Sequence, residues 1–370
     1  MHKPIKEQYL VSGFLAFFLI HSVQVGVGML SFQRTIVKEA GYDGWSSVLI
    51  SGLAVHIIVA CMYLLLKRSN GDLMSIHQQI FGKWVGNILS SIAMIYFIGV
   101  SVTVLRSYIE VVQVWMFSDL PTWGITIVSV SFFYYVVSGG FRTVVGLAFI
   151  GVIIPALLFP VLLLPLEYAQ FINMLPILKH SILDLLLGAK EATLSFLGVE
   201  LLLLFYPFLK KKEDTQKWSQ LAVFTTTTIY LLIMLVSLSF FSEEQLNKTI
   251  WATLTLFKVV QLPFLERFEY IGISMWMFLI APNIGLLLWA ATRCAKVVFK
   301  MSQRKALIIA VVLVGIACIM LPSRQEIKIF NEMIGNIGFY FVYVYIPILV
   351  ILQTLVVKIR RNKHGQSTSV

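Results

Sequence analysis

Long apolar runs recur along nearly the whole chain, and they constrain its fold more than any other feature. A run of about 18 or more apolar residues, coiled as an α-helix, crosses the roughly 30 Å hydrocarbon core of a bilayer. The chain has 370 residues, of which 58% are hydrophobic and only 13% are charged. That charge is about half the usual content of a soluble domain. The sequence therefore predicts an all-α polytopic membrane protein.

We expect ten transmembrane helices in this chain. They are placed at about 10–32, 44–66, 88–117, 121–138, 144–166, 182–209, 217–241, 268–297, 305–322 and 334–358. The first run lacks a small-residue cleavage site, so we expect a retained span rather than a signal peptide. Residues 242–267 mix apolar and charged side chains at helical spacing, which predicts an amphipathic helix over the outer face.

Basic residues indicate how the chain is oriented. Most of the 29 Lys and Arg residues fall on the side that holds both termini, which the positive-inside rule places in the cytoplasm. The net charge of +11 follows from these loops and implies no nucleic-acid partner. We expect one integral-membrane, permease-like domain over residues 1–361 and a polar cytoplasmic tail at 362–370. Within the domain, one repeat covers about 10–166 and a second about 182–358.

The stretch "QVGVGML", residues 24–30, places Gly26 and Gly28 inside the first apolar run. Each glycine costs a helix interior roughly 1 kcal/mol against alanine. A break inside hydrocarbon requires partners for the freed backbone groups, either from neighbouring helices or from a ligand. Transporters with discontinuous helices use such breaks to bind a solute or an ion. Close helix packing is the alternative explanation of a glycine pair.

A second stretch, "SFLGVE" at residues 195–200, forms a counterpart in the sixth apolar run. Gly198 permits unusual backbone there, and Glu200 adds a carboxylate inside the membrane. Because each repeat would hold five spans, an odd number, the second repeat would be inverted relative to the first. This 5+5 inverted repeat with discontinuous helices one and six is typical of the LeuT-like amino acid permease superfamily (APC). Glu200 would hold the break, meet a ligand amine or titrate, or else would be a structural carboxyl capped by backbone.

Three other polar residues lie within apolar runs. Arg106 and Glu110 share a helix face and are expected to pair with each other near the outer surface, as a structural ion pair or as a gate. Asn283, in "APNIGLL", is a candidate ligand or ion contact, although a kink alone explains Pro282. The fifth span carries no lysine, so ion coupling has no support. We find no enzyme motif and expect no catalysis, no cofactor and no metal.

The chain resembles the endospore germination permeases, which are the B subunits of bacterial spore germinant receptors. The matching pieces are the glycine pair with Arg34, "DGW" at 43–45, "GKW" at 82–84, "YFIGV" at 96–100, Arg106 and Glu110, "GG" at 139–140, "SFLGVE" with Pro207, "IW" at 250–251, and "ERFE" at 266–269 with Trp276. Two positions depart from the family pattern, because Gln33 and Ala252 stand where a proline is usual.

This resemblance implies a sensor of a small-molecule germinant, such as an amino acid, in the spore inner membrane. It also implies two partners, a larger A subunit and a lipoprotein C subunit. The pocket is expected between spans one, three, six and eight, lined by Gly26, Gly28, Met29, Val100, Leu197, Gly198, Glu200, Asn283 and Leu287. Structural or gating roles are expected for Arg106, Glu110, Glu266, Arg267 and Glu269.

Three alternatives stay open at this point. "ERFE" would latch the outer helix or form a subunit contact. The chain as a whole would be an ordinary amino acid secondary transporter instead of a sensor, or a passive subunit whose partner carries the site.

Overall fold

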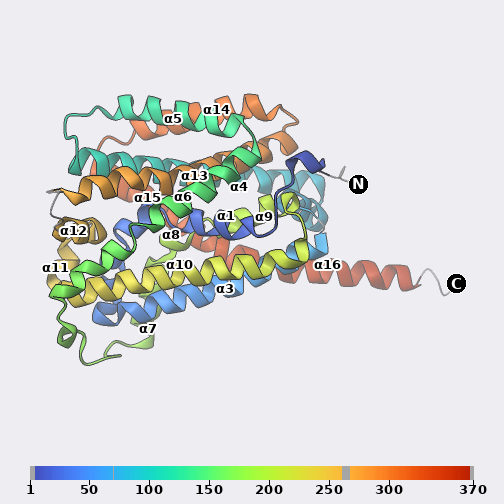
Figure 1. Cartoon of the computed structure of the whole chain (residues 1–370). Coiled ribbons are helices and arrows are strands. Elements are labelled where there is room, and N and C mark those ends of the chain that lie inside the picture. The colour runs from blue at the N-terminus through green and yellow to red at the C-terminus, as the bar shows by residue number, and fades with distance from the viewer. Residues whose placement is uncertain (1–4, 70, 261–266, 367–370) are drawn as a thin grey trace.

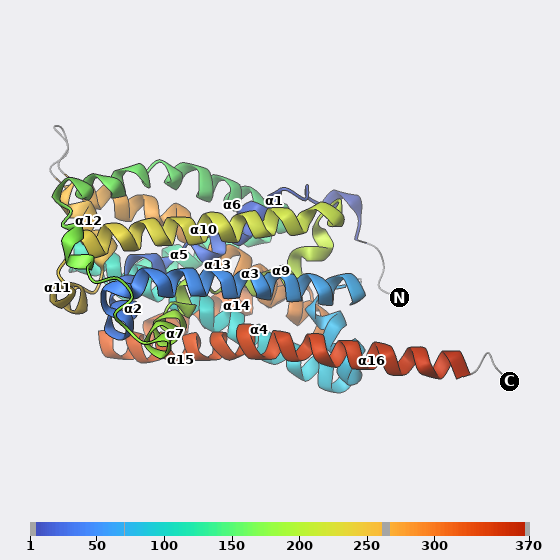
Figure 2. The same ribbon diagram turned by 90° about the horizontal axis from the view of Figure 1, so that it is seen from below.

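The computed structural model of the chain describes residues 5–69, 71–260 and 267–366, and these form a bundle of helices. The segment before α1 and the end of α16 lie at one end of the bundle, opposite α11 and α12 (Figure 1, Figure 2). We call the end that holds the segment before α1 the N-terminal end, and the end that holds α11 and α12 the far end. Among the described residues, the extended pairing is limited to an isolated bridge between Val11 and Leu209.

The elements follow one another along the chain with short connections. They are η1 (Glu7–Tyr9), α1 (Leu15–Gln24), η2 (Val27–Leu30), α2 (Phe32–Ala40), η3 (Gly41–Asp43), α3 (Gly44–Ser69), α4 (Leu73–Trp115), α5 (Thr122–Ser138), α6 (Phe141–Ala156), η4 (Pro160–Tyr168), η5 (Phe171–Met174), α7 (Ile182–Glu191), α8 (Thr193–Phe196), η6 (Val199–Leu201), α9 (Leu202–Phe205), η7 (Tyr206–Phe208), α10 (Lys212–Phe240), α11 (Glu243–Lys248), α12 (Ala252–Val259), α13 (Phe268–Val298), α14 (Gln303–Ile319), α15 (Arg324–Phe339), the π-helix η8 (Tyr340–Tyr345) and α16 (Ile346–Gln366).

Length and apolar composition allow six helical segments of the described chain to cross a membrane, and a seventh if the bent pair 182–208 counts as one span. The apolar helices α1 and α5 are shorter. The expected total of ten crossings therefore stays a prediction, and so do the boundaries of the two repeats. The polar tail expected at 362–370 also stays a prediction, although the helix α16 continues to Gln366.

Two boundaries differ from the sequence prediction. The expected amphipathic helix over 242–267 is two short helices, α11 and α12, because residues 249–251 between them are not helical. Residues 261–266 lie outside the described part. The third span begins earlier than expected, since α4 includes a first helical section that turns at Gly82, where φ is +78°. A glycine tolerates that left-handed conformation without strain.

Both predicted helix breaks are present. The helix α1 ends at Gln24, Gly26 is extended with φ −134° and ψ −150°, and a new helical segment begins at Val27. In the second broken segment, Leu197 is extended and Gly198 has φ +102°, in the left-handed region. Discontinuous helices one and six, predicted from the two glycine stretches, are confirmed.

The two breaks face each other at close range. A Cβ atom added to Gly198 would lie 2.7 Å from Cβ of Val23, and one added to Gly28 would lie 2.8 Å from Oγ of Ser195. Real Cβ atoms do not approach so closely, so glycine is required for the contact as well as for the backbone angle. The sequence thus places glycine where two interrupted helices touch.

Replacing Gly198 by alanine should destabilise the fold. The left-handed backbone alone costs a side chain about 1–2 kcal/mol, and the new methyl group also meets Val23. We expect a clearly lower unfolding temperature for the detergent-solubilised protein.

Gly146→Ala provides the matched control, because no atom lies within 4 Å of the Cβ that it would add and it lies inside the helix α6. We expect this variant to unfold at or above the wild-type temperature. Equal unfolding temperatures for the two variants would contradict the assigned strain at Gly198.

Candidate ligand site at the two helix breaks

Tyr230 on α10 ties the two breaks together. Its hydroxyl oxygen lies 3.0 Å from the carbonyl oxygen of Gln24 and 3.2 Å from that of Ser195, and its proton can be donated to either. A second link runs from Nε2 of Gln24 to the carbonyl oxygen of Phe196 at 3.4 Å. All four residues are buried. A backbone carbonyl released in hydrocarbon needs such a donor.

Other released carbonyls of the first broken segment are also held by side chains from distant elements. These contacts are Asn283 Nδ2 to the oxygen of Val23 at 2.9 Å, Trp276 Nε1 to the oxygen of Gly26 at 3.3 Å, and Thr253 Oγ1 to the oxygen of Met29 at 2.7 Å. Asn283 and Trp276 both come from α13, whereas Thr253 comes from α12. The helix α12 is therefore hydrogen-bonded directly to the first broken segment.

Glu200 caps the second break. Its buried carboxylate accepts the backbone N–H of Gly198 at 2.8 Å and the hydroxyl of Tyr96 at 2.7 Å. The carboxylate lies at the start of the short helical segment that follows the break, where free N–H groups and the helix dipole favour a negative charge. The sequence left several roles open for Glu200, and these two hydrogen bonds match the role of holding the break.

A small cavity of about 30 Å³ lies between the breaks. It is lined by Val23, Gln24, Gly26, Val27, Gly28, Val100, Thr103, Val104, Leu194, Ser195, Leu197, Gly198 and Asn283. The volume is about that of one water molecule, so an amino acid can enter only if the helical segments move apart.

Six of the nine expected ligand-binding residues line this cavity. They are Gly26, Gly28, Val100, Leu197, Gly198 and Asn283. The other three, Met29, Glu200 and Leu287, are buried but do not line it. Their assignment to the ligand stays a prediction.

Gln24 and Thr103 were missed in the sequence analysis, although both line the cavity. The available signal was composition, since Gln24 is a polar side chain in an apolar run directly before the glycine pair. Polar residues within membrane spans generally face the interior of the bundle. Thr103 carried no such signal, because threonine is common in membrane helices and bonds readily to its own backbone.

The prediction that Arg106 and Glu110 pair with each other is wrong, because each side chain has a different partner in the structure. Nε of Arg106 donates to the carbonyl oxygen of Leu321 at 2.8 Å, and Nη2 lies 3.4 Å from that of Pro322. Glu110 instead pairs with Arg324 at 3.2 Å. The helical spacing allowed a mutual pair, but the loop between α14 and α15 supplies carbonyl acceptors for Arg106 and the start of α15 supplies a cation for Glu110.

The "ERFE" motif is described only in part. Arg267 pairs with the buried Glu269 at 3.1 Å and lies 4.0 Å from the ring centre of Tyr270, and both of these contacts lie at the start of α13. Glu266 lies outside the described residues. The choice between a latch and a subunit contact is not decided by these contacts.

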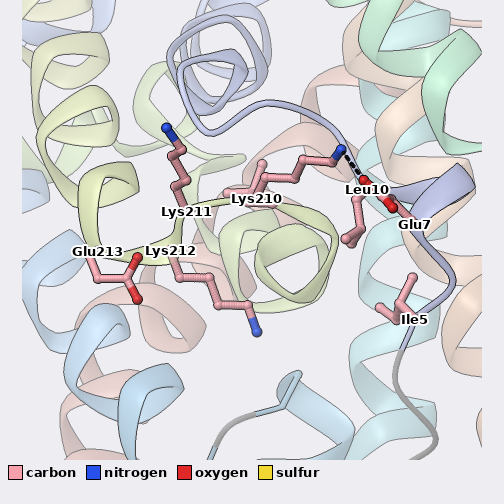
Figure 3. Close-up of a pocket in the computed structure, with 8 residues that line it drawn as sticks. Ile5, Glu7, Leu10, Lys210, Lys211, Lys212 and Glu213 are labelled. Atoms are coloured by element: carbon pink, nitrogen blue, oxygen red, sulfur yellow. Dashed lines mark hydrogen bonds and ion pairs between the residues drawn. The ribbon is translucent and has the colours of Figure 1, made fainter.

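The larger cavity, of about 520 Å³, is not the one between the breaks. It opens at the N-terminal end of the bundle, beside three consecutive lysines (Figure 3). Its lining residues are Ile5, Glu7, Leu10, Leu209, Lys210, Lys211, Lys212 and Glu213. We place the candidate site at the smaller cavity, because polar groups from several helices converge there and none of the larger cavity's residues belongs to a break.

At the N-terminal end of the bundle, residues 7–11 are hydrogen-bonded to residues 208–210 and to Arg142, and we call this segment the strap. The backbone N–H of Val11 donates to the oxygen of Phe208 at 2.9 Å, and that of Lys210 donates to the oxygen of Val11 at 2.8 Å. Arg142 donates to the carbonyl oxygens of Glu7 and Leu10, at 3.3 and 3.0 Å from Nη2. These bonds connect the segment before α1 with the end of the second broken segment.

Comparisons with known proteins identify relatives of this chain. The family described as "Spore germination protein" matches residues 10–327. The spore germination protein GerQB of Bacillus cereus is 42% identical over 97% of this chain and 100% of its own length. The spore germination protein YndE of Bacillus subtilis (strain 168) is 24% identical over 91% of this chain and 94% of its own.

Two solved structures share the fold. A substrate-bound, outward-open Na⁺-coupled sialic acid symporter has a TM-score of 0.65 at 13% identity and covers 94% of this chain and 78% of its own. MhsT in complex with L-phenylalanine has a TM-score of 0.61 at 15% identity and covers 93% and 88%. These likenesses confirm the predicted LeuT-like fold, and at such low identity they show the fold alone.

Removing the Glu200 cap should destabilise the second break. In Glu200→Leu the buried N–H of Gly198 loses its acceptor, which costs about 1–3 kcal/mol. Glu200→Gln keeps one carbonyl oxygen for that N–H and should lose less stability than Glu200→Leu, although the proton of Tyr96 then lacks its acceptor. Thermal unfolding of the purified protein measures both, and equal losses in the two variants would contradict the capping role.

The strap should respond to pH through Glu7. The hydrogen bond and charge of Lys210 hold the pKa of Glu7 below its ordinary value of 4.5. Because the folded-state pKa is lowered, the contact is intact above pH 4.5 and is lost as pH falls through the lowered value. A spin label at Tyr9→Cys should therefore gain mobility only below pH 4.5, and Glu7→Gln should remove this pH dependence.

Proposed function

The chain belongs to the spore germination protein family, and from this premise we propose that it binds a small amino acid germinant between its two helix breaks. It is a multi-pass membrane protein and the membrane subunit of a spore germinant receptor. The observation that carries the binding proposal is the pair of facing breaks, at Gly26 and Gly198, with a cavity between them.

The first break supports recognition of a carboxylate. The helical segment that starts at Val27 begins inside the bundle, and the first N–H groups of a helix lack partners within it. Backbone N–H groups without a partner can donate to the oxygens of a carboxylate. The second break is different, because the chain's own Glu200 already occupies the corresponding position.

The rest of the cavity supports a small apolar side chain. Val100 and Val104 line it from α4, and Leu197 lines it from the extended backbone before Gly198, so the side chains around the cavity are largely apolar there. We propose the predicted ligand set, Gly26, Gly28, Met29, Val100, Leu197, Gly198, Glu200, Asn283 and Leu287, as the residues that contact or frame the germinant.

Signalling follows from the need to open the cavity. A ligand that fits only the opened arrangement shifts the chain toward it by its differential affinity. We propose that this shift reaches an A subunit and a lipoprotein C subunit as a coupling free energy of roughly 1–3 kcal/mol. We also propose the spore inner membrane as the location, with both termini in the cytoplasm.

An ordinary amino acid transporter is the alternative, and the fold permits it. The relatives are named as germination proteins rather than enzymes, and the two solved structures have transporter folds. Uptake of labelled amino acid into proteoliposomes against a gradient would favour the transporter. Germination that depends on this chain without any uptake would favour the sensor.

Filling the cavity should weaken binding. Val100→Phe adds a ring at a buried position on α4 that lines the cavity, so we expect a large loss of amino acid binding to the purified protein and of germination in spores. The control is Ile95→Phe on the same helix, where the side chain is 64% exposed and the ring has space. Binding by Val100→Phe at the level of this control would contradict the assigned pocket.

A further inference from the structure

Two polar atoms at the small cavity have no partner. Within the part of the chain that the structure describes, Oε1 of Gln24 and Oγ1 of Thr103 are buried and make no hydrogen bond. Each side chain is 1% exposed, and both line the cavity between the breaks. A buried polar atom without a partner costs free energy, so its presence in a membrane interior requires an explanation.

The amide of Gln24 has a defined orientation. Its Nε2 lies 3.4 Å from the carbonyl oxygen of Phe196, and only the amide nitrogen can donate to that oxygen. The carbonyl end, Oε1, is therefore the end left unpaired. Thr103 follows Val100 by three residues on α4 and lies on the same face of that helix. The two unpaired oxygens thus come from two different helices that line the cavity, α1 and α4.

The other acceptors near the first break are already occupied. In this kind of fold the carbonyls of an unwound helix commonly face a cation. Here the oxygens of Val23, Gln24 and Gly26 accept from the neutral donors of Asn283, Tyr230 and Trp276. These carbonyls are therefore already engaged with neutral donors, and Tyr230 has one proton for the carbonyls of Gln24 and Ser195.

The buried carboxylate is occupied as well. Glu200 accepts from Tyr96 and from the backbone of Gly198, and neither bond can be given up without leaving a buried partner unsatisfied. Glu200 also does not line the cavity. Among the side-chain oxygens that line the cavity, those of Gln24 and Thr103 are buried and left without a partner in the described part of the chain.

We propose that Oε1 of Gln24 and Oγ1 of Thr103 receive the ammonium group of the amino acid germinant. This inference rests on the proposed function and adds the group that reads the amine. The carboxylate would meet the N–H groups that begin at Val27, while the ammonium would be hydrogen-bonded by an amide and a hydroxyl instead of paired with an acid. Both residues are then specificity-determining, because they distinguish an amino acid from the same carbon chain without its amine.

The test compares ligands that differ only in that group. Binding of L-alanine, L-valine and L-leucine to the purified protein in nanodiscs is measured against propionate, 3-methylbutanoate and 4-methylpentanoate. Thr103→Val removes the hydroxyl with little change of shape. We expect amino acid binding on the order of 10- to 100-fold weaker, with binding of the three carboxylates unchanged. Gln24→Met should act in the same direction, and Thr103→Ser should restore the preference.

Thr126→Val is the matched control. Oγ1 of Thr126 is likewise buried without a partner among the described residues, but it lies on α5 and does not line the cavity. We expect this variant to keep the wild-type preference.

The outcomes separate the two proposals. If the wild-type protein binds none of the three amino acids, the proposed ligand class fails, and this inference fails with it. If the wild type binds an amino acid but Thr103→Val and Gln24→Met keep its preference over the matching carboxylate, only the amine assignment is overturned. Should Gln24→Met fail to fold, the comparison of Thr103→Val with Thr103→Ser decides the matter alone.

Discussion

A backbone carbonyl that is released inside hydrocarbon must find a donor, and the structure of this chain depends on how that need is met. Four side chains from three other helices supply donors at the first broken segment, and all four carbonyls that accept lie within three residues of Gly26. Since an unpaired group would cost several kcal/mol in the membrane, these bonds fix the relative positions of α10, α12 and α13 around the breaks. A change at either break therefore alters hydrogen bonds on helices that are distant in sequence.

The helix breaks could be predicted from sequence because their cause is local. A glycine inside an apolar run disfavours the helix by itself, and the left-handed angle of Gly198 is one that side chains avoid. The partners of the charged residues could not be predicted in the same way. Glu110 and Arg106 have the spacing of a helix pair, yet Glu110 bonds to Arg324, which is 214 residues away in sequence. Only the packing of α15 beside α4 brings that arginine within reach.

The residues of the candidate site could likewise be predicted from sequence where their cause is local, and not where it depends on distant partners. Positions that the break itself defines, such as Gly26, Gly28 and Gly198, line the cavity, and so do apolar neighbours on α4 and α8. Gln24 and Thr103 needed the structure, because being unpaired is a property of the whole surroundings and not of a residue type. The fold is shared with transporters at 13–15% identity, which fits a framework set mainly by backbone requirements.

The strap at the N-terminal end has a mechanical consequence. The two interrupted helices are joined at their breaks through Tyr230 and Gln24, and again at their ends, where Val11 is bonded to Phe208 and Lys210. Two rigid helical segments that are held together at two separate points can rotate relative to each other only about the line that joins those points. While the strap holds, any widening between these helices must be a hinge-like swing about that axis; once it is released, the ends can splay independently.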